Sequence, residues 1–486
     1  FDHAWNGYRV DGRTLTMEVD NDPDPIWLDV DGLRAEVTAA LHAAPDETWQ
    51  VRIVARSRRT LAASLPVPAL GWTAARPVES DVGGMPPDSV QVESDGRRLT
   101  NGLLTVTVAD DGTFDLESAD GTIAGGVGRI VDGGDFGDSY NYGPPGSDTL
   151  VDAPSAVAVE TLLSGPVVSR LLVRREYDWP RGVASDGSAR TAERVPVEVL
   201  TRLELRAGEP FVRVELAFEN RSDDHRVRFH LPLPRATGRS HAEGQFAVVE
   251  RGLSGEGGYR EEPLGTYPAH GWVDAGGIAV LLEHLAEYEL VEDGAELTLT
   301  VLRSIGLISR NDNPYRQDPA GPAIPIPDAQ MRGRRHLRFA LFPHSGDWAA
   351  GGVASAAERY RHPLLATPGH GHDADAWPPS MAGDDALAIE GDGVNLTSLR
   401  RRDGGWIELR LVNLDGDRRR AVVRGGLLEA REASLRGEPG ETLAIDGDRL
   451  ELQLGPAEVR TIQLRRRETA VGRPEVLDAA GPRQNA

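Results

Sequence analysis

Polar and aromatic residues are concentrated in one glycine-rich segment, residues 133–145, which reads G-G-D-F-G-D-S-Y-N-Y-G-P-P. Glycines permit tight turns and close approach of the backbone. Carboxylate and amide groups exchange hydrogen bonds with sugar hydroxyls, and tyrosine rings offer apolar faces to the C–H side of a pyranose. The segment could therefore form a sugar-contacting loop. Composition alone favours an ordinary loop whose Asp and Asn side chains bond their own backbone.

A second polar cluster, N-R-S-D-D-H-R-V-R at residues 220–228, follows one expected strand and precedes another. Asp224, His225 and Arg226 could form a polar cluster where the strand ends. A turn that contains an Asp–Arg pair is the simpler interpretation, and it would add little stability at the surface.

A third candidate is Arg303, which ends the apolar run of V-L-R-S-I-G at residues 301–306. Arg310 and Asp312 follow it closely. A long arginine side chain at a strand end can face a cleft, or it can cover apolar surface while its charged end stays in water. The sequence leaves both interpretations open.

A fourth cluster has the spacing His-x-His-Asp, formed by His370, His372 and Asp373. Imidazole and carboxylate groups are competent zinc ligands. The cluster lies in a stretch rich in Pro and Gly that is typical of a linker, and a third ligand elsewhere in the sequence is not evident. We therefore predict no metal in this chain, although the sequence leaves metal binding by this cluster open.

Composition excludes several classes of function. The formal net charge of −23 argues against nucleic acid and anionic membranes as partners. The chain has no cysteine, which excludes disulfides and thiolate chemistry and suits a cytoplasmic location. We find no lysine, and therefore no phosphate-binding loop, and no apolar run long enough for a membrane span. No charged-then-apolar leader opens the chain, and its first residue is Phe1 and not methionine, so we expect a chain that was processed or cut from a longer one.

Alternation with a period of two dominates the chain and predicts antiparallel strands. Leu104–Val108 and the run from Phe114 are joined by Asp-Gly, as in a hairpin. Further strands are expected at 157–163, 167–177, 195–205, 212–218, 297–302, 337–342, 406–412, 443–454 and 459–464. Only residues 348–361 are expected to be helical. The fold class is therefore mostly β, with antiparallel sandwiches.

The sequence divides into five segments. We expect a small β-sandwich at 1–80, a large central sandwich domain with extended sheets at 81–366, a linker at 367–385, a small C-terminal sandwich at 386–466 and a flexible tail at 467–486.

Six groups of residues, in one order, resemble the β-rich C-terminal half of glycoside hydrolase family 38 α-mannosidases. The run 132–145 is similar to that family's glycine- and aspartate-rich loop, and D-H-R-V-R at 224–228 to its D-H-R-L-R turn. The other matching segments are V-P-A-L-G-W at 67–72, L-T-N-G-L at 99–103 with D-G-T at 111–113, L-R-S-I-G at 302–306 with A-G-P at 320–322, Gln330 and Gly333, and N-L at 413–414 with G-P-A-E-V at 455–459.

The resemblance implies a large galactose-mutarotase-like central super-sandwich and a role in a retaining glycosidase that acts on α-mannosides. It places zinc and the nucleophile in a catalytic domain N-terminal to everything matched, so we expect no catalytic residue here. The residues expected to contact substrate or to support the loop at the cleft rim are Tyr140, Arg303, Asp138, Asp135 and Tyr142.

Three functions follow as hypotheses. The first is the β portion of an α-mannosidase, inactive alone and completed by a catalytic domain in the same or another chain. The second is a stand-alone carbohydrate-binding or scaffolding module. The third is a mutarotase-like sugar epimerase, which needs a histidine acid and a carboxylate base in one cleft. His225, His230, His270 and His284 are available for that role, and homo-oligomerisation stays open.

Overall fold

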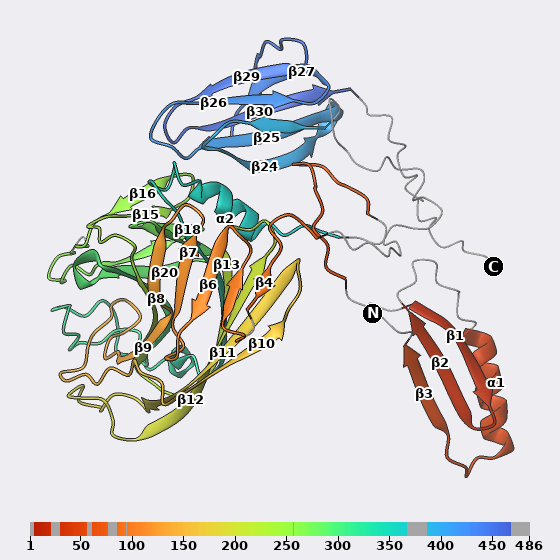
Figure 1. The fold of residues 1–486 in the computed structure, drawn as a ribbon, viewed down its shortest axis with the longest axis horizontal. Helices are drawn as coiled ribbons and strands as arrows, with labels where there is room; N and C mark the ends of the chain where they lie inside the picture. Colours follow the sequence, from red (N-terminus) through yellow and green to blue (C-terminus); the bar gives the residue numbers. More distant parts are fainter. Residues whose placement is uncertain are drawn as a thin grey trace. The chain divides into compact units, whose positions relative to one another are not determined.

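The computed structural model describes most of the chain, and Figure 1 shows its ribbon. The chain divides into two units. One comprises residues 1–77, 364–386 and 467–486, and the other comprises residues 78–363 and 387–466. The described residues are 4–20, 30–55, 61–75, 85–93, 95–255, 257–366 and 386–467.

The first unit contains a small mixed sheet and a helix. Strands β1 (Ala4–Asp11) and β2 (Thr14–Asp20) pair antiparallel, and β3 (Gln50–Ala55) pairs parallel to β2. A parallel pair needs a crossover connection, and α1 (Val30–Ala43) lies within that connection. The expected β-sandwich at 1–80 is therefore wrong for the described residues, and α1 was missed. Its alanines and leucines favour a helix.

The central domain is built on a nine-stranded antiparallel sheet. Its alternating residues face a shared hydrophobic core, as a half-buried sheet requires. In spatial order the strands are β10 (Ala156–Leu163), β11 (Val168–Pro180), β12 (Arg194–Arg206), β13 (Val212–Asn220), β22 (Gly333–Pro343), β19 (Ile278–Leu282), β18 (Trp272–Ala275), β15 (Ser240–Glu243) and β16 (Val248–Arg251).

Two five-stranded sheets contribute to the same core. One has the order β4 (Gln91–Val92), β5 (Arg98–Thr100), β6 (Leu104–Val108), β7 (Phe114–Ser118) and β8 (Ile123–Val127). The other has the order β17 (Thr266–Ala269), β20 (Ala286–Val291), β21 (Glu296–Ser304), β14 (His225–Pro232) and β9 (Arg129–Gly134). The second of these sheets carries the candidate site, and we call it the site sheet.

Helix α2 (Val353–Arg361) packs on β18, β19 and β22 through a separate apolar cluster that includes Phe211, Trp272 and Tyr360. Short 3-10 turns occur at η1 (Glu292–Gly294), η2 (Pro327–Gln330) and η3 (Asp403–Gly405). None of the helices in the described part of the chain has the length and apolar character needed to cross a bilayer.

The C-terminal domain has two antiparallel sheets around its own core, which includes Leu409, Val423 and Leu452. One sheet is β23 (Ala388–Glu390), β26 (Arg419–Arg424) and β29 (Arg449–Leu454). The other is β24 (Val394–Arg402), β25 (Trp406–Asn413), β30 (Val459–Arg466), β27 (Leu427–Ala433) and β28 (Pro439–Thr442).

The mostly β, multi-domain fold class is confirmed. The hairpin of β6 and β7 forms as expected, and the expected strand at 443–454 is shorter, because only Arg449–Leu454 forms β29. The domain boundaries remain predictions. The linker at 367–385 lies outside the described residues, as does the tail beyond Arg467.

A β-bulge in the site sheet sets which side chains share a face. Thr300 of β21 pairs with Arg228 of β14, but the next pair is Leu302 with Val227, so Val301 has no opposite residue. Val301 and Leu302 are both buried in the core as a result. Alternation resumes one residue out of phase, and Arg303 stands opposite Arg226.

Candidate functional site

Residues 134–145, here called the glycine-rich loop, begin at the end of β9. Gly134 pairs with His225 at the start of β14, and His225 pairs with Ser304 at the end of β21. The loop, the 220–228 turn and Arg303 therefore meet at one end of the site sheet. This arrangement brings together three of the four clusters that the sequence singled out.

Asp135 anchors the first half of the loop. Its side chain is fully buried, and its Oδ2 accepts a 2.6 Å hydrogen bond from Arg303 Nε. Its Oδ1 accepts from the backbone amides of Gly137 at 2.9 Å and Gly143 at 3.3 Å. Arg303 Nη2 also donates to the Asn141 carbonyl at 2.6 Å. Burial raises the pKa of Asp135, although Arg303 opposes that shift.

Asp138 anchors the second half of the loop, and it is buried too. Its Oδ1 accepts from the amides of Tyr140 and Asn141, both at 3.0 Å, and its Oδ2 accepts from the Arg310 amide at 2.7 Å. Arg316, itself almost fully buried, forms an ion pair with it. Burial works against the charged form, but the bonds from Arg316 and the amides hold the pKa of Asp138 below its usual value.

The two tyrosines of the loop differ in exposure. Tyr140 is 56% exposed, so its ring is free to contact a ligand. Tyr142 is half-buried, and the guanidinium of Arg226 lies 3.7 Å from its ring centroid. Tyr315 packs beside it, with ring centroids 6.2 Å apart.

The five predicted site residues therefore lie in one neighbourhood. Asp135, Asp138 and Arg303 form ion pairs within the fold and stabilise the loop. Gly137 is required there because a Cβ would collide with the Asn141 carbonyl oxygen. Their roles in substrate contact remain predictions, and Tyr140 is the best exposed of the loop's aromatic rings.

The 220–228 cluster does not act as one unit. Asp224 bonds to the Gln330 side chain at 2.8 Å, and His225 Nδ1 lies 2.6 Å from Asp132 Oδ1. Arg226 instead stacks on Tyr142. The expected Asp–Arg pair within the turn is not found among the described residues, because Asp223 pairs with Arg332 and Asp224 bonds to Gln330 instead.

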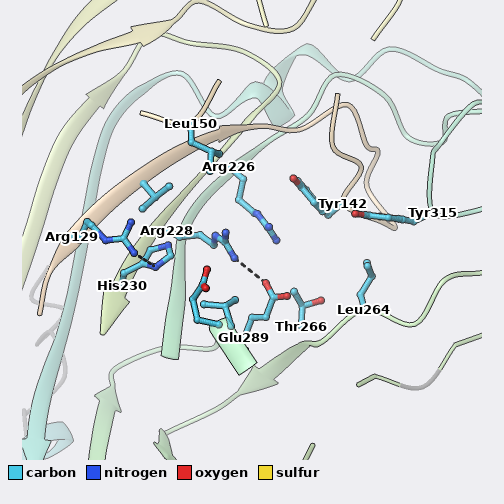
Figure 2. A pocket seen from close by; sticks show the side chains of 13 residues that line it. Arg129, Tyr142, Leu150, Arg226, Arg228, His230, Leu264, Thr266, Glu289 and Tyr315 are labelled. Carbon is cyan, nitrogen blue, oxygen red and sulfur yellow. Dashed lines mark hydrogen bonds and ion pairs between the residues drawn. The ribbon is translucent and has the colours of Figure 1, made fainter. Parts of the chain in front are cut away.

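A pocket of about 330 Å³ opens on the outer face of the site sheet, and sequence reasoning missed it. Figure 2 shows how Arg226 and Arg228 reach into it from β14. We call it the arginine pocket. Its lining residues are Arg129, Val131, Tyr142, Leu150, Arg226, Arg228, His230, Leu264, Thr266, Glu289, Val291, Glu292 and Tyr315.

A signal for this pocket was present in the sequence. Residues 226–231 read R-V-R-F-H-L, in which cationic or polar residues alternate with apolar ones. Val227, Phe229 and Leu231 face the core, so the other three side chains must share the opposite face. The partners on β9 and β20 come from distant parts of the sequence, and local alternation does not identify them.

Most charges in the arginine pocket are neutralised within the protein. Arg228 Nη1 donates to Glu289 at 2.9 Å, and Arg129 Nη2 donates to Glu296 at 3.1 Å. His230 Nδ1 lies 2.7 Å from Glu296. Burial lowers the pKa of His230, although Glu296 opposes the shift.

Two polar groups at the pocket are left unmatched. His230 Nε2 is buried and meets no hydrogen-bonding group in the described part of the chain. Arg226 is only 7% exposed, and no hydrogen bond or ion pair joins its guanidinium to any described residue, although the guanidinium stacks on the ring of Tyr142.

A metal site was sought among the same residues. No three His, Asp or Glu side chains in the described ranges are grouped so that they could hold a metal ion. The His370–His372–Asp373 cluster lies outside the described residues. The described residues therefore do not fit the zinc that the resemblance associates with the catalytic domain.

The chain has the fold of the β-rich part of an α-mannosidase. An α-mannosidase from Enterococcus faecalis V583 superposes with a TM-score of 0.64 and 17% identity, over 77% of this chain and 43% of that one. A second Enterococcus faecalis structure, described as a protein in glycosyl hydrolase family 38, gives the same score over 44% of its length. No family model matches the sequence.

Curated relatives agree with this fold. A protein named "Putative mannosylglycerate hydrolase" from Halalkalibacterium halodurans is 25% identical over 287 residues, which are 57% of this chain and 29% of that protein. Mouse alpha-mannosidase 2C1 is 27% identical over 206 residues, 40% of this chain and 18% of that protein. The chain thus spans less than a third of these relatives, and its predicted resemblance to family 38 is confirmed.

Proposed function

We propose that this chain is the β portion of a retaining glycosidase that hydrolyses α-mannosides, and that it shapes the rim of a cleft whose catalytic domain is supplied in the same or another chain. The observation that carries the proposal is the superposition of 77% of this chain on less than half of an α-mannosidase. The six sequence segments that resemble family 38 lie in this same chain.

The loop carboxylates are poorly suited to glycoside chemistry. A retaining glycosidase needs one carboxylate that attacks the sugar and another that transfers a proton. Asp135 and Asp138 are buried, and their oxygens already accept bonds from Arg303, Arg316 and backbone amides. Because both carboxylates are fully buried, neither presents an oxygen to a sugar at the surface, so we assign both a positioning role.

Tyr140 is the residue that we assign to substrate contact. Asp138 fixes the backbone on either side of the tyrosine, because its Oδ1 binds the amides of Tyr140 and Asn141. The tyrosine therefore has a hydrogen-bonded backbone and a side chain that is 56% exposed. An aromatic ring in this position can pack on the apolar face of a mannose unit.

Activity measurements test the proposal in two stages. The purified chain, given zinc and 4-nitrophenyl α-mannoside, is expected to show no turnover, and turnover by this chain alone would overturn the claim that it is incomplete. The product of the complete coding sequence is expected to hydrolyse the substrate. Tyr140→Ala in that product should raise KM, whereas Tyr259→Ala, which removes a tyrosine that is 83% exposed outside the loop, should not.

One observation favours the epimerase alternative. His230 lines the arginine pocket together with Glu289, so a histidine and a carboxylate face one cavity, as mutarotation requires. Burial keeps His230 neutral near pH 7 by lowering its pKa, which suits a base better than an acid. Polarimetry on freshly dissolved glucose and galactose decides this point: unchanged rates with the purified chain would exclude the alternative.

A further inference from the structure

We propose that the arginine pocket binds a single sugar unit that carries an oxyanion, either a carboxylate or a phosphate, and that Arg226 is the principal anion-binding residue. This inference goes beyond the proposed function, which requires neither a charged substrate nor a second sugar site. It concerns a pocket that lies wholly within this chain, so it can be tested without a catalytic domain.

Arg226 has a mostly buried side chain that lines the pocket, and its guanidinium has no anionic partner among the described residues. Arginine side chains that are largely buried in proteins usually form ion pairs or hydrogen bonds. Arg226 is 7% exposed and makes neither with any residue that the structure describes. Its five N–H donors are held in a planar fork against Tyr142, and this geometry suits a bidentate oxyanion.

Asp135 is not an ion-pair partner of Arg226. Asp135 is close enough to influence Arg226 electrostatically. Both of its oxygens are already occupied by Arg303 and the amides of Gly137 and Gly143. Arg226 therefore faces the pocket with its donors unused.

The neighbouring cation strengthens the case. Arg226 and Arg228 both line the pocket, and burial together with the adjacent Arg226 lowers the pKa of Arg228, as expected for two like charges in one pocket. Glu289 forms an ion pair with Arg228, but no described residue forms one with Arg226. An anion between them would relieve this repulsion. The chain as a whole is strongly acidic, so the pocket is a local exception and not part of a general basic surface.

The rest of the pocket suits a sugar. Tyr142, Tyr315 and Leu264 supply apolar faces on one side, and Thr266 and Glu289 supply groups that bond hydroxyls (Figure 2). The volume of about 330 Å³ is at the lower end of the range for small-molecule sites, so one sugar unit fits better than an oligosaccharide. His230 Nε2 is a further unmatched polar atom in the wall.

Isothermal titration calorimetry on the purified chain tests the proposal. The probes are glucuronate for the carboxylate, mannose 6-phosphate for the phosphate and mannose as the neutral control. We expect at least one charged sugar to bind tenfold or more tightly than mannose, with affinity that falls as salt is added. No heat from either charged sugar at millimolar concentration, or equal binding of all three, would overturn the proposal.

Variants locate the site. Arg226→Gln should weaken binding of the charged sugar by about 10- to 100-fold, because a charge-assisted hydrogen bond is worth roughly 1.5–3 kcal/mol. Arg228→Gln, measured in parallel, should also weaken binding of the charged sugar. It provides a second test of the pocket if Arg226→Gln does not fold. Arg181→Gln, at an exposed arginine outside the pocket, is the matched control. Unchanged binding in both pocket variants would place the anion elsewhere and refute the inference.

The two charged probes also separate the sources of the oxyanion. Binding of glucuronate alone would identify the ligand as an acidic sugar, and binding of mannose 6-phosphate alone would identify it as a sugar phosphate. Either result supports a pocket for a sugar that carries an oxyanion. The readout does not depend on hydrolysis. A failed binding test would leave the proposed function standing, and an inactive complete enzyme would leave this pocket standing.

Discussion

In the glycine-rich loop, both acidic side chains form buried ion pairs: Asp135 with Arg303, and Asp138 with Arg316. In the arginine pocket, on the outer face of the same sheet, Arg226 is nearly as buried and forms no ion pair with any described residue. The loop contains the conspicuous sequence motif, yet its charges are used to hold its own backbone. The pocket has no such motif, yet it keeps a charge available.

This difference separates two reasons for burying a charge. A buried pair with complete hydrogen bonding fixes a conformation, and the loop uses it to present Tyr140. A buried charge without a counter-ion is unfavourable in the free protein, and it becomes favourable when an anion arrives.

The largest effect is expected from Asp138→Ala. It removes the acceptor of three backbone amides and leaves Arg316 buried without its counter-ion. We expect a loss of about 3–5 kcal/mol in the free energy of unfolding, measured from the urea transition of the central domain. Glu198→Ala, which breaks the exposed pair with Arg174, should cost less than about 1 kcal/mol. Similar costs for both variants would show that the loop is not held by its ion pairs.

A smaller effect, with a defined pH dependence, is expected from Asp138→Asn. The native pKa of Asp138 lies below its ordinary value of 3.8, so the charged form stabilises the fold above about pH 4. Wild type should exceed the variant by about 1.5–3 kcal/mol at pH 7. The difference should shrink as the pH falls through the lowered pKa, which chemical unfolding at a series of pH values would follow. A constant difference down to pH 2 would contradict this assignment.

Tyr142→Leu tests the pocket side of the comparison. It removes the ring beneath Arg226 while it keeps an apolar side chain of moderate size. Loss of the cation–π contact is expected to weaken binding of the charged sugar about two- to fivefold, from roughly 0.5–1 kcal/mol. Tyr142→Phe keeps the ring face and should bind almost as wild type. A loss as large in Tyr142→Phe would mean that the hydroxyl, and not the stacked ring, is responsible.

The smallest effect on stability is expected from Tyr140→Ala. The ring is 56% exposed, and surface substitutions of this kind usually change stability by less than about 0.5 kcal/mol. Thermal unfolding of Tyr140→Ala, measured in parallel with Asp138→Ala, would compare the exposed tyrosine with the aspartate that binds its backbone. A marked drop in the midpoint would assign Tyr140 a packing role and weaken its assignment to substrate contact.

Local pattern was sufficient for much of the fold. Strands such as β12 and β13 alternate without interruption, so the sequence predicted them almost to the residue. Helix α1 was missed although Leu33, Val37 and Leu41 recur at a helical spacing, because the period-two pattern that dominates the rest of the chain was extended to this segment. The β-sandwich expected for the first 80 residues failed for the same reason.

The site was predicted only in part. Composition pointed to the glycine-rich loop, but the ion-pair partners of its aspartates are 168 and 178 residues away along the chain. No local spacing in the sequence can show that Asp135 forms an ion pair with Arg303 or that Asp138 forms one with Arg316. The arginine pocket was missed for a different reason. Its alternation along β14 was visible, but the significance of Arg226 lies in an absent counter-ion, which only three-dimensional contacts reveal.

The bulge at Val301 makes the position of Arg303 depend on the pairing register of β21. Because the unpaired residue shifts the phase of β21, Arg303 faces Asp135 while Leu302 stays in the core. The same residues paired without the bulge would exchange these two faces and direct the guanidinium inward. The irregular pairing of this one strand is therefore what connects the glycine-rich loop to its arginine.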